Sequence, residues 1–210
     1  MMKHIGRLHV LTDTELQSRF THVELAKMAI QGGADTIQFR QKTGSTREMI
    51  EIAREIKRLC ADAHVTFIVN DRVDVAIASE ADGVHLGHDD FPIPLARQLL
   101  GETRIIGGSA VTLEEAQHCF SEGANYIGFG PVYPTTSKDD AGPVTGIALL
   151  EEVVKTITIP IIAIGGVTVE NTLEVIRAGA QGIAVISAVC CQENPEQAAR
   201  ELSQALQSGE

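Results

Sequence analysis

Two aspartates, Asp71 and Asp90, each follow a short apolar segment of the kind that forms a buried strand. Neighbouring strands lie about 4.8 Å apart, so carboxylates at the ends of two such strands can reach one small cation. Mg²⁺ prefers one or two carboxylates, completed by waters and phosphate oxygens, and no cluster of cysteine and histidine offers a softer site. We interpret the pair as Mg²⁺ ligands; the alternative is that each aspartate caps the helix after it.

Two positive charges and two amide side chains lie close together in the segment Gln38-Phe39-Arg40-Gln41-Lys42. Alternation along a strand places Gln38, Arg40 and Lys42 on one face. A buried arginine is costly unless it is paired. We therefore expect Arg40 to meet either Asp71 or an anionic ligand, the simple alternative being a buried Arg–Asp ion pair.

A loop of small hydroxyl side chains and one cation follows the apolar segment 126–131. It contains Thr135, Thr136, Ser137 and Lys138. Three hydroxyl donors beside an ammonium group suit phosphate oxygens, so we interpret this loop as one that closes on phosphate. The alternative is an ordinary solvated turn.

Glycine and serine stand at two later positions where phosphate is commonly held. Gly165 and Gly166 follow the apolar segment that begins at residue 160, and Ser187 ends the segment 182–187. Glycine lets the main chain approach an anion closely, and the start of a following helix favours negative charge. The alternative at Gly165-Gly166 is a plain tight turn.

The histidines do not suggest nucleophilic catalysis. His85 ends an apolar segment and either faces the site or packs, and the other six histidines show no catalytic spacing. No nucleophile elbow or Ser-His-Asp order is present. The chemistry indicated is therefore binding and charge stabilisation of phosphorylated molecules.

Four related phrases show how the elements that carry these residues repeat. Each phrase ends a helical pattern with Gly or Asp and then begins a β-branched apolar strand, at 31–39, 79–86, 121–129 and 177–185. Such strands, apolar on both faces, are typical of a parallel sheet covered by helices. The clearest helical patterns, 45–60 and 112–123, begin with the spacing of a capping box.

Extending the same pattern along the chain predicts eight strands, at 8–13, 36–41, 66–71, 83–87, 105–110, 126–131, 160–166 and 182–187. Eight strand–helix units favour an α/β fold of the (β/α)8 barrel (TIM barrel) type, with residues 1–210 forming a single domain. The alternative is an open doubly wound sheet, but no strand is followed by a GxGxxG motif. In such barrels the site lies at the carboxyl ends of the strands, which is where the polar residues above are found.

Composition restricts the partners. The 210 residues include 17 basic and 28 acidic side chains, giving a net charge of −11. This charge argues against nucleic acid and anionic membranes, and no apolar run approaches the roughly 20 residues of a membrane helix. The four cysteines lack CxxC spacing, so we expect reduced packing cysteines in a cytoplasmic protein without a signal peptide.

In combination, these motifs resemble the thiamine-phosphate synthase family over nearly the whole chain. The resemblance is carried in order by QFRQK (38–42), NDR (70–72), GVHLGHDD (83–90), GGSAVTLEEA (107–116), GPVYPTTSKDD (130–140), IPIIAIGG (159–166) and GIAVISA (182–188). It implies a transferase. An aminopyrimidine methyl diphosphate loses pyrophosphate, and the nitrogen of hydroxyethylthiazole phosphate, or of its carboxylated form, captures the methylene to give thiamine phosphate.

The resemblance also assigns roles by position. It implies Mg²⁺ on Asp71 and Asp90, and the pyrimidine near Gln38. It implies that the diphosphate meets Arg40, Lys42, Asn70, Ser109 and Lys138, that Thr135 and Ser137 cover the phosphates, and that the thiazole phosphate rests on Gly166, Ile186 and Ser187. We interpret Arg40, Lys42, Ser109 and Lys138 as the catalytic set, because neutralising a departing pyrophosphate makes it leave more easily. A neutral thiazole nitrogen needs no general base.

Two other functions compete with this interpretation. One is an isomerase acting on a phosphorylated heterocycle or sugar, as in the related thiazole tautomerases. Many relatives carry histidine where this chain has Val111, and that histidine is linked to tautomerase activity, so its absence weakens the isomerase alternative. The other is a non-enzymatic phosphate-binding barrel. We expect small-molecule substrates as partners, and a homodimer is compatible with the sequence.

Overall fold

Eight parallel strands form a closed barrel in the order β1 to β8, with β8 paired to β1. A computed structural model describes residues 4–137 and 142–208. The strands are β1 (Leu8–Thr12), β2 (Thr36–Phe39), β3 (Thr66–Asn70), β4 (Gly83–Leu86), β5 (Ile105–Ala110), β6 (Tyr126–Phe129), β7 (Ile161–Ile164) and β8 (Gly182–Val185). The predicted (β/α)8 barrel is confirmed, and each strand lies inside its predicted range.

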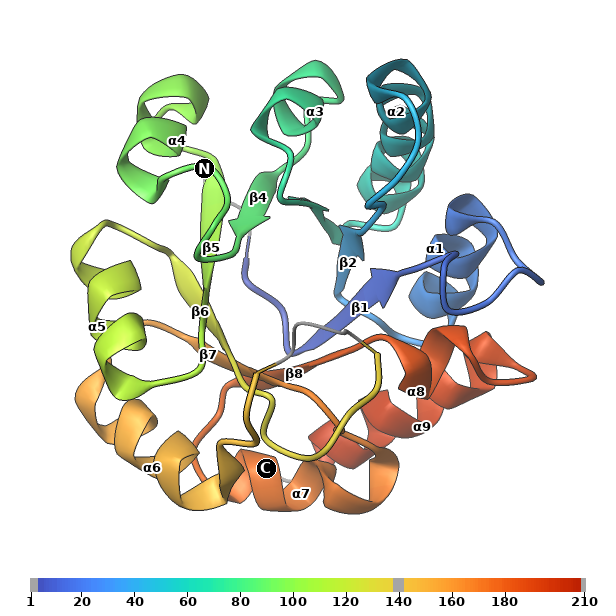
Figure 1. The fold of residues 1–210 in the computed structure, drawn as a ribbon. Helices are drawn as coiled ribbons and strands as arrows, with labels where there is room; N and C mark the ends of the chain where they lie inside the picture. Colours follow the sequence, from blue (N-terminus) through green and yellow to red (C-terminus); the bar gives the residue numbers. More distant parts are fainter. Residues whose placement is uncertain (1–3, 138–141, 209–210) are drawn as a thin grey trace.

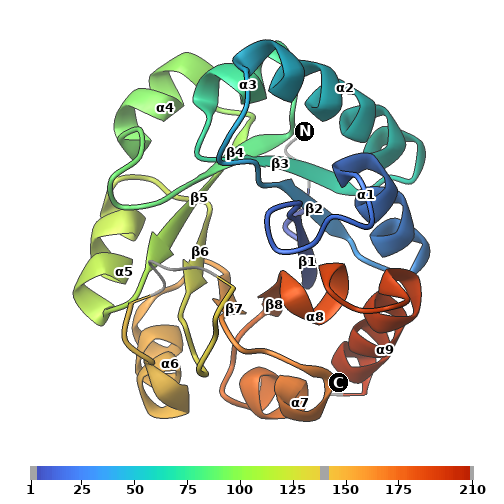
Figure 2. The same cartoon turned by 45° about the vertical axis from the view of Figure 1, so that its right-hand side comes forward.

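Helices surround the barrel as an outer ring, as Figures 1 and 2 show from two directions. They are α1 (His22–Gln31), α2 (Thr46–Asp62), α3 (Val73–Ala78), α4 (Ile93–Leu100), α5 (Leu113–Ser121), α6 (Gly146–Thr156), α7 (Val169–Arg177), α8 (Ser187–Cys190) and α9 (Pro195–Gln207). The two predicted helical patterns correspond to α2 and α5. Ser45 caps α2 and Thr112 caps α5 by accepting from the backbone N–H three residues later.

The four repeated phrases mark the ends of α1, α3, α5 and α7. Each phrase places one residue in the left-handed region directly after its helix: Gly33 (φ 97°), Glu80 (φ 56°), Gly123 (φ 93°) and Gly179 (φ 97°). A left-handed residue ends a helix and turns the chain back toward the sheet. The repetition in the sequence is therefore the repetition of one helix-to-strand turn.

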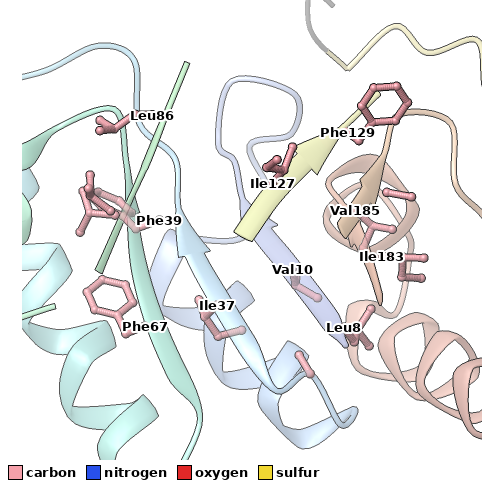
Figure 3. Close-up of a cluster of buried hydrophobic side chains, with 14 of the residues drawn as sticks. Leu8, Val10, Ile37, Phe39, Phe67, Leu86, Ile127, Phe129, Ile183 and Val185 are labelled. Carbon is pink, nitrogen blue, oxygen red and sulfur yellow. The ribbon is translucent and has the colours of Figure 1, made fainter. Parts of the chain in front are cut away.

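The main hydrophobic core lies between the barrel and the helices. Side chains alternate along the strands, so Leu8 and Val10 of β1 point outward to this core while Leu11 belongs to a second cluster inside the barrel. Figure 3 shows part of the outer core, where Ile37, Phe67 and other strand residues face the helices. Both faces of the sheet are apolar for this reason, as parallel sheets require.

The four cysteines, Cys60, Cys119, Cys190 and Cys191, are unbridged, and the first three are buried. This agrees with the expectation of packing cysteines. Within residues 4–137 and 142–208, no helix is both long and apolar enough to cross a membrane.

Candidate active site

A cavity of about 1010 Å³ opens at the carboxyl ends of the strands. Its wall contains most of the residues predicted from the sequence: Gln38, Lys42, Asn70, Asp71, Asp90, Ser109, Thr135, Ser137, Gly166, Ile186 and Ser187. Lys138 lies outside the described residues. The barrel thus brings together side chains from β2 to β8 and from the segments that follow these strands, up to 149 residues apart in sequence, as between Gln38 and Ser187.

The two predicted metal ligands lie in this wall, and neither caps a helix. The residue before α3 is Arg72 and the residue before α4 is Pro92. Oδ2 of Asp90 instead accepts from the Gly87 N–H at 2.7 Å. Asp71 has a left-handed backbone, with φ of 63°, a conformation that Asp and Asn adopt more readily than most residues. The capping alternative is therefore wrong for both aspartates.

The carboxyl groups of Asp71 and Asp90 influence each other's ionisation. Burial raises the pKa of Asp90, and its hydrogen bond with Asp71 raises it further. Burial acts on Asp71 in the same direction, but the hydrogen bond and charge of Lys42 outweigh it and leave the pKa of Asp71 below its ordinary value. Two carboxyls that resist simultaneous ionisation form a site where added positive charge is stabilising.

The donor atoms of this pair are of the kind that Mg²⁺ prefers and not of the kind that a softer metal prefers. Mg²⁺ takes one or two carboxylates and completes its shell with waters and substrate oxygens. Among the described residues, no group of three or more His, Cys, Asp or Glu side chains could hold a metal ion by itself. The donor set is therefore suited to an ion that arrives with, or is completed by, phosphate.

Arg40 forms the buried Arg–Asp ion pair that the sequence left as the alternative, but its partner is Asp13 and not Asp71. It lies one residue beyond the end of β2 and forms a buried ion pair with Asp13, the residue after β1. Asp71 pairs instead with Lys42, at 2.6 Å. Arg40 is absent from the cavity wall as far as the described residues form it. Its Nε is buried and finds no hydrogen-bond partner among those residues.

Asp13 is a functional candidate that the sequence reasoning did not single out. Its side chain is buried, pairs with Arg40, and accepts from the backbone N–H groups of Glu15 and Leu16. It thereby fixes the turn after β1 and balances the charge of Arg40. The available signal was its position, because Asp13 is a carboxylate at the carboxyl end of a strand.

Gln38 and Asn70 join β2 to β3 in the cavity wall. Gln38 donates through Nε2 to Oδ1 of Asn70 at 3.2 Å, and both side chains are buried. This bond leaves the carbonyl oxygen of Gln38 and the amide N–H groups of Asn70 for other hydrogen bonds. Both residues line the cavity, and their assignment to the pyrimidine and the diphosphate stays a prediction.

His85 faces the site, which answers the question that the sequence left open. Its Nδ1 lies 2.9 Å from the Tyr126 hydroxyl and its Nε2 lies 2.9 Å from Oγ of Ser109. All three residues line the cavity. Tyr126 was not predicted as a site residue; the only sequence signal was a hydroxyl in an otherwise apolar strand.

The loop after β6 is anchored to the loops after β7 and β8. Val132 and Tyr133 donate backbone N–H bonds to Ile164 and Gly165, and the hydroxyls of Ser137 and Ser187 lie 2.8 Å apart. Ser187 begins α8 and is not part of β8, a small correction to the predicted strand.

Gly166 is needed for this contact. Its φ is 65°, and a Cβ there would lie 2.5 Å from the carbonyl oxygen of Pro134 and 2.7 Å from Cβ of Tyr133. The predicted phosphate-binding glycine therefore also lets the β6 loop approach the end of β7.

Comparison with known proteins gives one consistent result. The family model described as "Thiamine monophosphate synthase" matches residues 8–189. A thiamine-phosphate synthase from Salinibacter ruber is 53% identical over 93% of this chain and 86% of its own length, and one from Methanocella arvoryzae is 52% identical over 93% and 92%. A solved structure, the thiamine phosphate pyrophosphorylase from Pyrococcus furiosus, is 42% identical with a TM-score of 0.89 over 96% of both chains.

Proposed function

The chain belongs to the thiamine monophosphate synthase family, and on that premise we propose how its barrel carries out the reaction. It is a transferase that makes thiamine phosphate, as the names of its relatives state for those proteins.

The supporting observation is that one cavity is lined by both groups of residues that we assign to anions. Lys42, Asp71 and Asp90 stand on one part of its wall, and Gly166, Ile186 and Ser187 stand on another. Two phosphorylated substrates bound in one cavity are held as neighbours, which removes much of the entropic barrier to joining them. A cavity of about 1010 Å³ is at the upper end of the range for small-molecule sites.

The pyrimidine diphosphate is assigned to the first part of the wall. Gln38 and Asn70 offer amide groups to the pyrimidine and the diphosphate, and Lys42 and Ser109 offer donors to the diphosphate oxygens. Lys138 is assigned to the same diphosphate from its place in the sequence. Arg40 acts from behind the wall, where its charge favours an anion although Asp13 offsets part of it.

Asp71 and Asp90 would hold Mg²⁺. When bound, the ion supplies positive charge that stabilises the departing pyrophosphate. The residues of the chain add donors to the same leaving group, so the bond between the methylene carbon and the diphosphate oxygen breaks before the new carbon–nitrogen bond forms. The aminopyrimidine ring delocalises the positive charge, and the thiazole nitrogen supplies the electron pair that captures the carbon.

The thiazole phosphate is assigned to the second part of the wall. The main chain at Gly166, Ile186 and Ser187 would bind its phosphate, with Thr135 and Ser137 covering it. Closure by the β6 loop would exclude water, which otherwise competes with the thiazole for the carbocation. Val111 lines the same cavity, and its apolar side chain cannot transfer a proton, which supports substitution over tautomerisation.

The decisive experiment incubates the protein with both phosphorylated substrates and Mg²⁺ and quantifies thiamine phosphate and pyrophosphate. We expect equal amounts of both products and none without the divalent ion. Pyrophosphate without thiamine phosphate would indicate a hydrolase, and isomerised thiazole phosphate without pyrophosphate would indicate a tautomerase. Either result would overturn the proposal.

We also propose a location and an assembly state for the protein. A cytoplasmic location agrees with the unbridged cysteines, because reducing compartments keep thiols free. A homodimer is proposed as the assembled form, and sedimentation of the purified protein would test it.

A further inference from the structure

The register of three strands brings His85 and Tyr126 together across a glycine. His85 of β4 is paired with Gly107 of β5, and Gly107 is paired with Tyr126 of β6. A Cβ on Gly107 would lie 2.5 Å from His85 Nδ1 and 2.5 Å from Cε1 of Tyr126. The missing side chain is therefore what lets the imidazole and the phenol meet inside the barrel.

A second glycine makes room for the other side of the imidazole. Gly128 of β6 is paired with Ser109 of β5, and a Cβ there would lie 3.0 Å from Cε1 of His85. The ring thus spans from Tyr126 to Ser109 over two positions that carry no side chain. Tyr126, His85 and Ser109 thus form one chain of hydrogen bonds, for which the two glycines leave space.

The Tyr126 hydroxyl determines which group donates and which accepts at each hydrogen bond of that chain. Tyr126 is 2% exposed, and burial raises its pKa well above the ordinary value, so the hydroxyl keeps its proton. Its one hydrogen-bond partner among the described residues is Nδ1 of His85. A buried hydroxyl proton without an acceptor costs free energy, so Tyr126 donates and His85 Nδ1 accepts.

The donor and acceptor roles at Nδ1 then determine those between the imidazole and Ser109. When Nδ1 accepts a hydrogen bond, the ring proton resides on Nε2. Nε2 lies 2.9 Å from Oγ of Ser109, so His85 donates to the serine oxygen. The proton of Ser109 must point elsewhere, and no acceptor for it occurs within residues 4–137 and 142–208, while Ser109 itself lines the cavity.

We propose that Tyr126 and His85 are positioning residues that hold the Ser109 hydroxyl as a hydrogen-bond donor toward an anionic group in the cavity. The identification of that anion as the diphosphate rests on the proposed function, whereas the direction of the relay does not. In the opposite direction, Ser109 would donate to His85 and be lost as a donor to the ligand, and the Tyr126 proton would be left buried without an acceptor.

The ¹⁵N NMR spectrum of the histidine side chains tests the relay without any substrate. In the free wild-type protein at neutral pH we expect a pyridine-type Nδ1 and a pyrrole-type Nε2 for His85. The signals are assigned by their loss in His85→Gln and, independently, by the Nε2 shift in Ser109→Ala. A proton on Nδ1, in either the neutral or the cationic ring, would overturn the proposal.

Matched tyrosine variants provide a control for the spectrum. Tyr126→Phe removes the donor to Nδ1 and should shift that signal. The chain's other tyrosine, Tyr133, donates to Glu174 on α7 at 2.7 Å, outside the relay, so Tyr133→Phe should leave the His85 signals in place. Equal shifts in both variants would contradict the assigned hydrogen bond.

A double-mutant cycle tests whether the relay acts through Ser109. Tyr126→Phe should lower kcat about tenfold while leaving KM for the thiazole phosphate unchanged. In a Ser109→Ala background the same substitution should have almost no further effect, because the hydroxyl that it orients is gone. Equal losses in both backgrounds would show that Tyr126 acts by another route. If the wild type forms no thiamine phosphate, the proposed function fails while the NMR result still decides the relay.

Discussion

Nζ of Lys42 lies 2.6 Å from Oδ2 of Asp71, so an ammonium group already neutralises one of the two carboxylates assigned to Mg²⁺. The Lys42 side chain is 41% exposed, and ion pairs at such exposure contribute little to stability. Asp71 can therefore exchange this partner for a metal ion at small cost. Lys42 would then be released to a diphosphate oxygen, which would couple metal binding to the binding of the diphosphate by Lys42.

The Asp71 carboxylate is predicted to be essential for turnover but not for folding. Asp71→Asn keeps the side-chain shape and tolerates the left-handed backbone at this position. We expect kcat/KM at saturating Mg²⁺ to fall at least about a hundredfold, with a thermal midpoint near that of the wild type. Steady-state kinetics and circular dichroism would measure the two effects.

Asp74 offers a matched control for that variant. It lies three residues away and pairs with Arg72 at the surface, at 2.6 Å. Asp74→Asn removes the same charge without touching the cavity, and its activity should stay close to that of the wild type. Wild-type activity in Asp71→Asn would remove the basis for the metal site.

The buried Arg40–Asp13 pair is predicted to couple stability to the site. Asp13→Asn keeps an acceptor for the turn after β1 but leaves the Arg40 charge buried without its partner. Breaking a buried ion pair in this way lowers the free energy of unfolding by about 3–5 kcal/mol. The double variant Asp13→Asn with Arg40→Met should recover part of that loss in urea unfolding. It should not recover activity, since the cation near the diphosphate is missing. Strictly additive losses in stability would refute the coupling.

Lys138 is predicted to serve the leaving group and not the thiazole. Lys138→Ala should lower kcat by about 10²-fold, the size of effect seen when a donor to developing charge is removed. Binding of the thiazole phosphate, measured by calorimetry, should change far less. Lys155→Ala, on the exposed face of α6 beside Glu151, is the control. A loss confined to thiazole affinity would move Lys138 to the other substrate.

Two buried histidines are predicted to make the barrel sensitive to acid. Burial lowers the pKa of both His9 and His22 to about 4. The unfolded chain takes up these protons near the ordinary pKa of about 6.5, whereas the folded chain does not until about pH 4. The free energy of unfolding should therefore fall as the pH drops from 6.5 to 4, by about 3 kcal/mol per histidine, and then level off.

Urea unfolding at several pH values would measure this loss. His22 is held between the hydroxyls of Thr12 and Thr14, at 2.9 and 3.1 Å. His22→Gln can keep hydrogen bonds there without titrating, so its stability should decline less steeply below pH 6.5. Parallel pH profiles for the variant and the wild type would show that His22 is not the titrating group.

Local pattern was enough to predict the barrel and the end at which its site lies. Each strand and helix carries its own periodicity, and the turns after α1, α3, α5 and α7 each carry a left-handed residue, so these features depend on neighbours in the sequence. The predicted strand ranges were too long at Arg40, which lies beyond β2, and at Ser187, which begins α8. In both cases the prediction included in the strand a polar residue that only follows it.

The sequence by itself determined the number of strands, the family, and eleven residues of one cavity wall, because periodicity and ordered motifs are properties of short segments. The tertiary structure alone decided the partners: Asp13 for Arg40, Lys42 for Asp71, and His85 between Tyr126 and Ser109. Those contacts join residues that lie on different strands or just after them. Their geometry depends on how the strands are staggered around the closed barrel and on which positions, such as Gly107, leave space for a neighbour's ring.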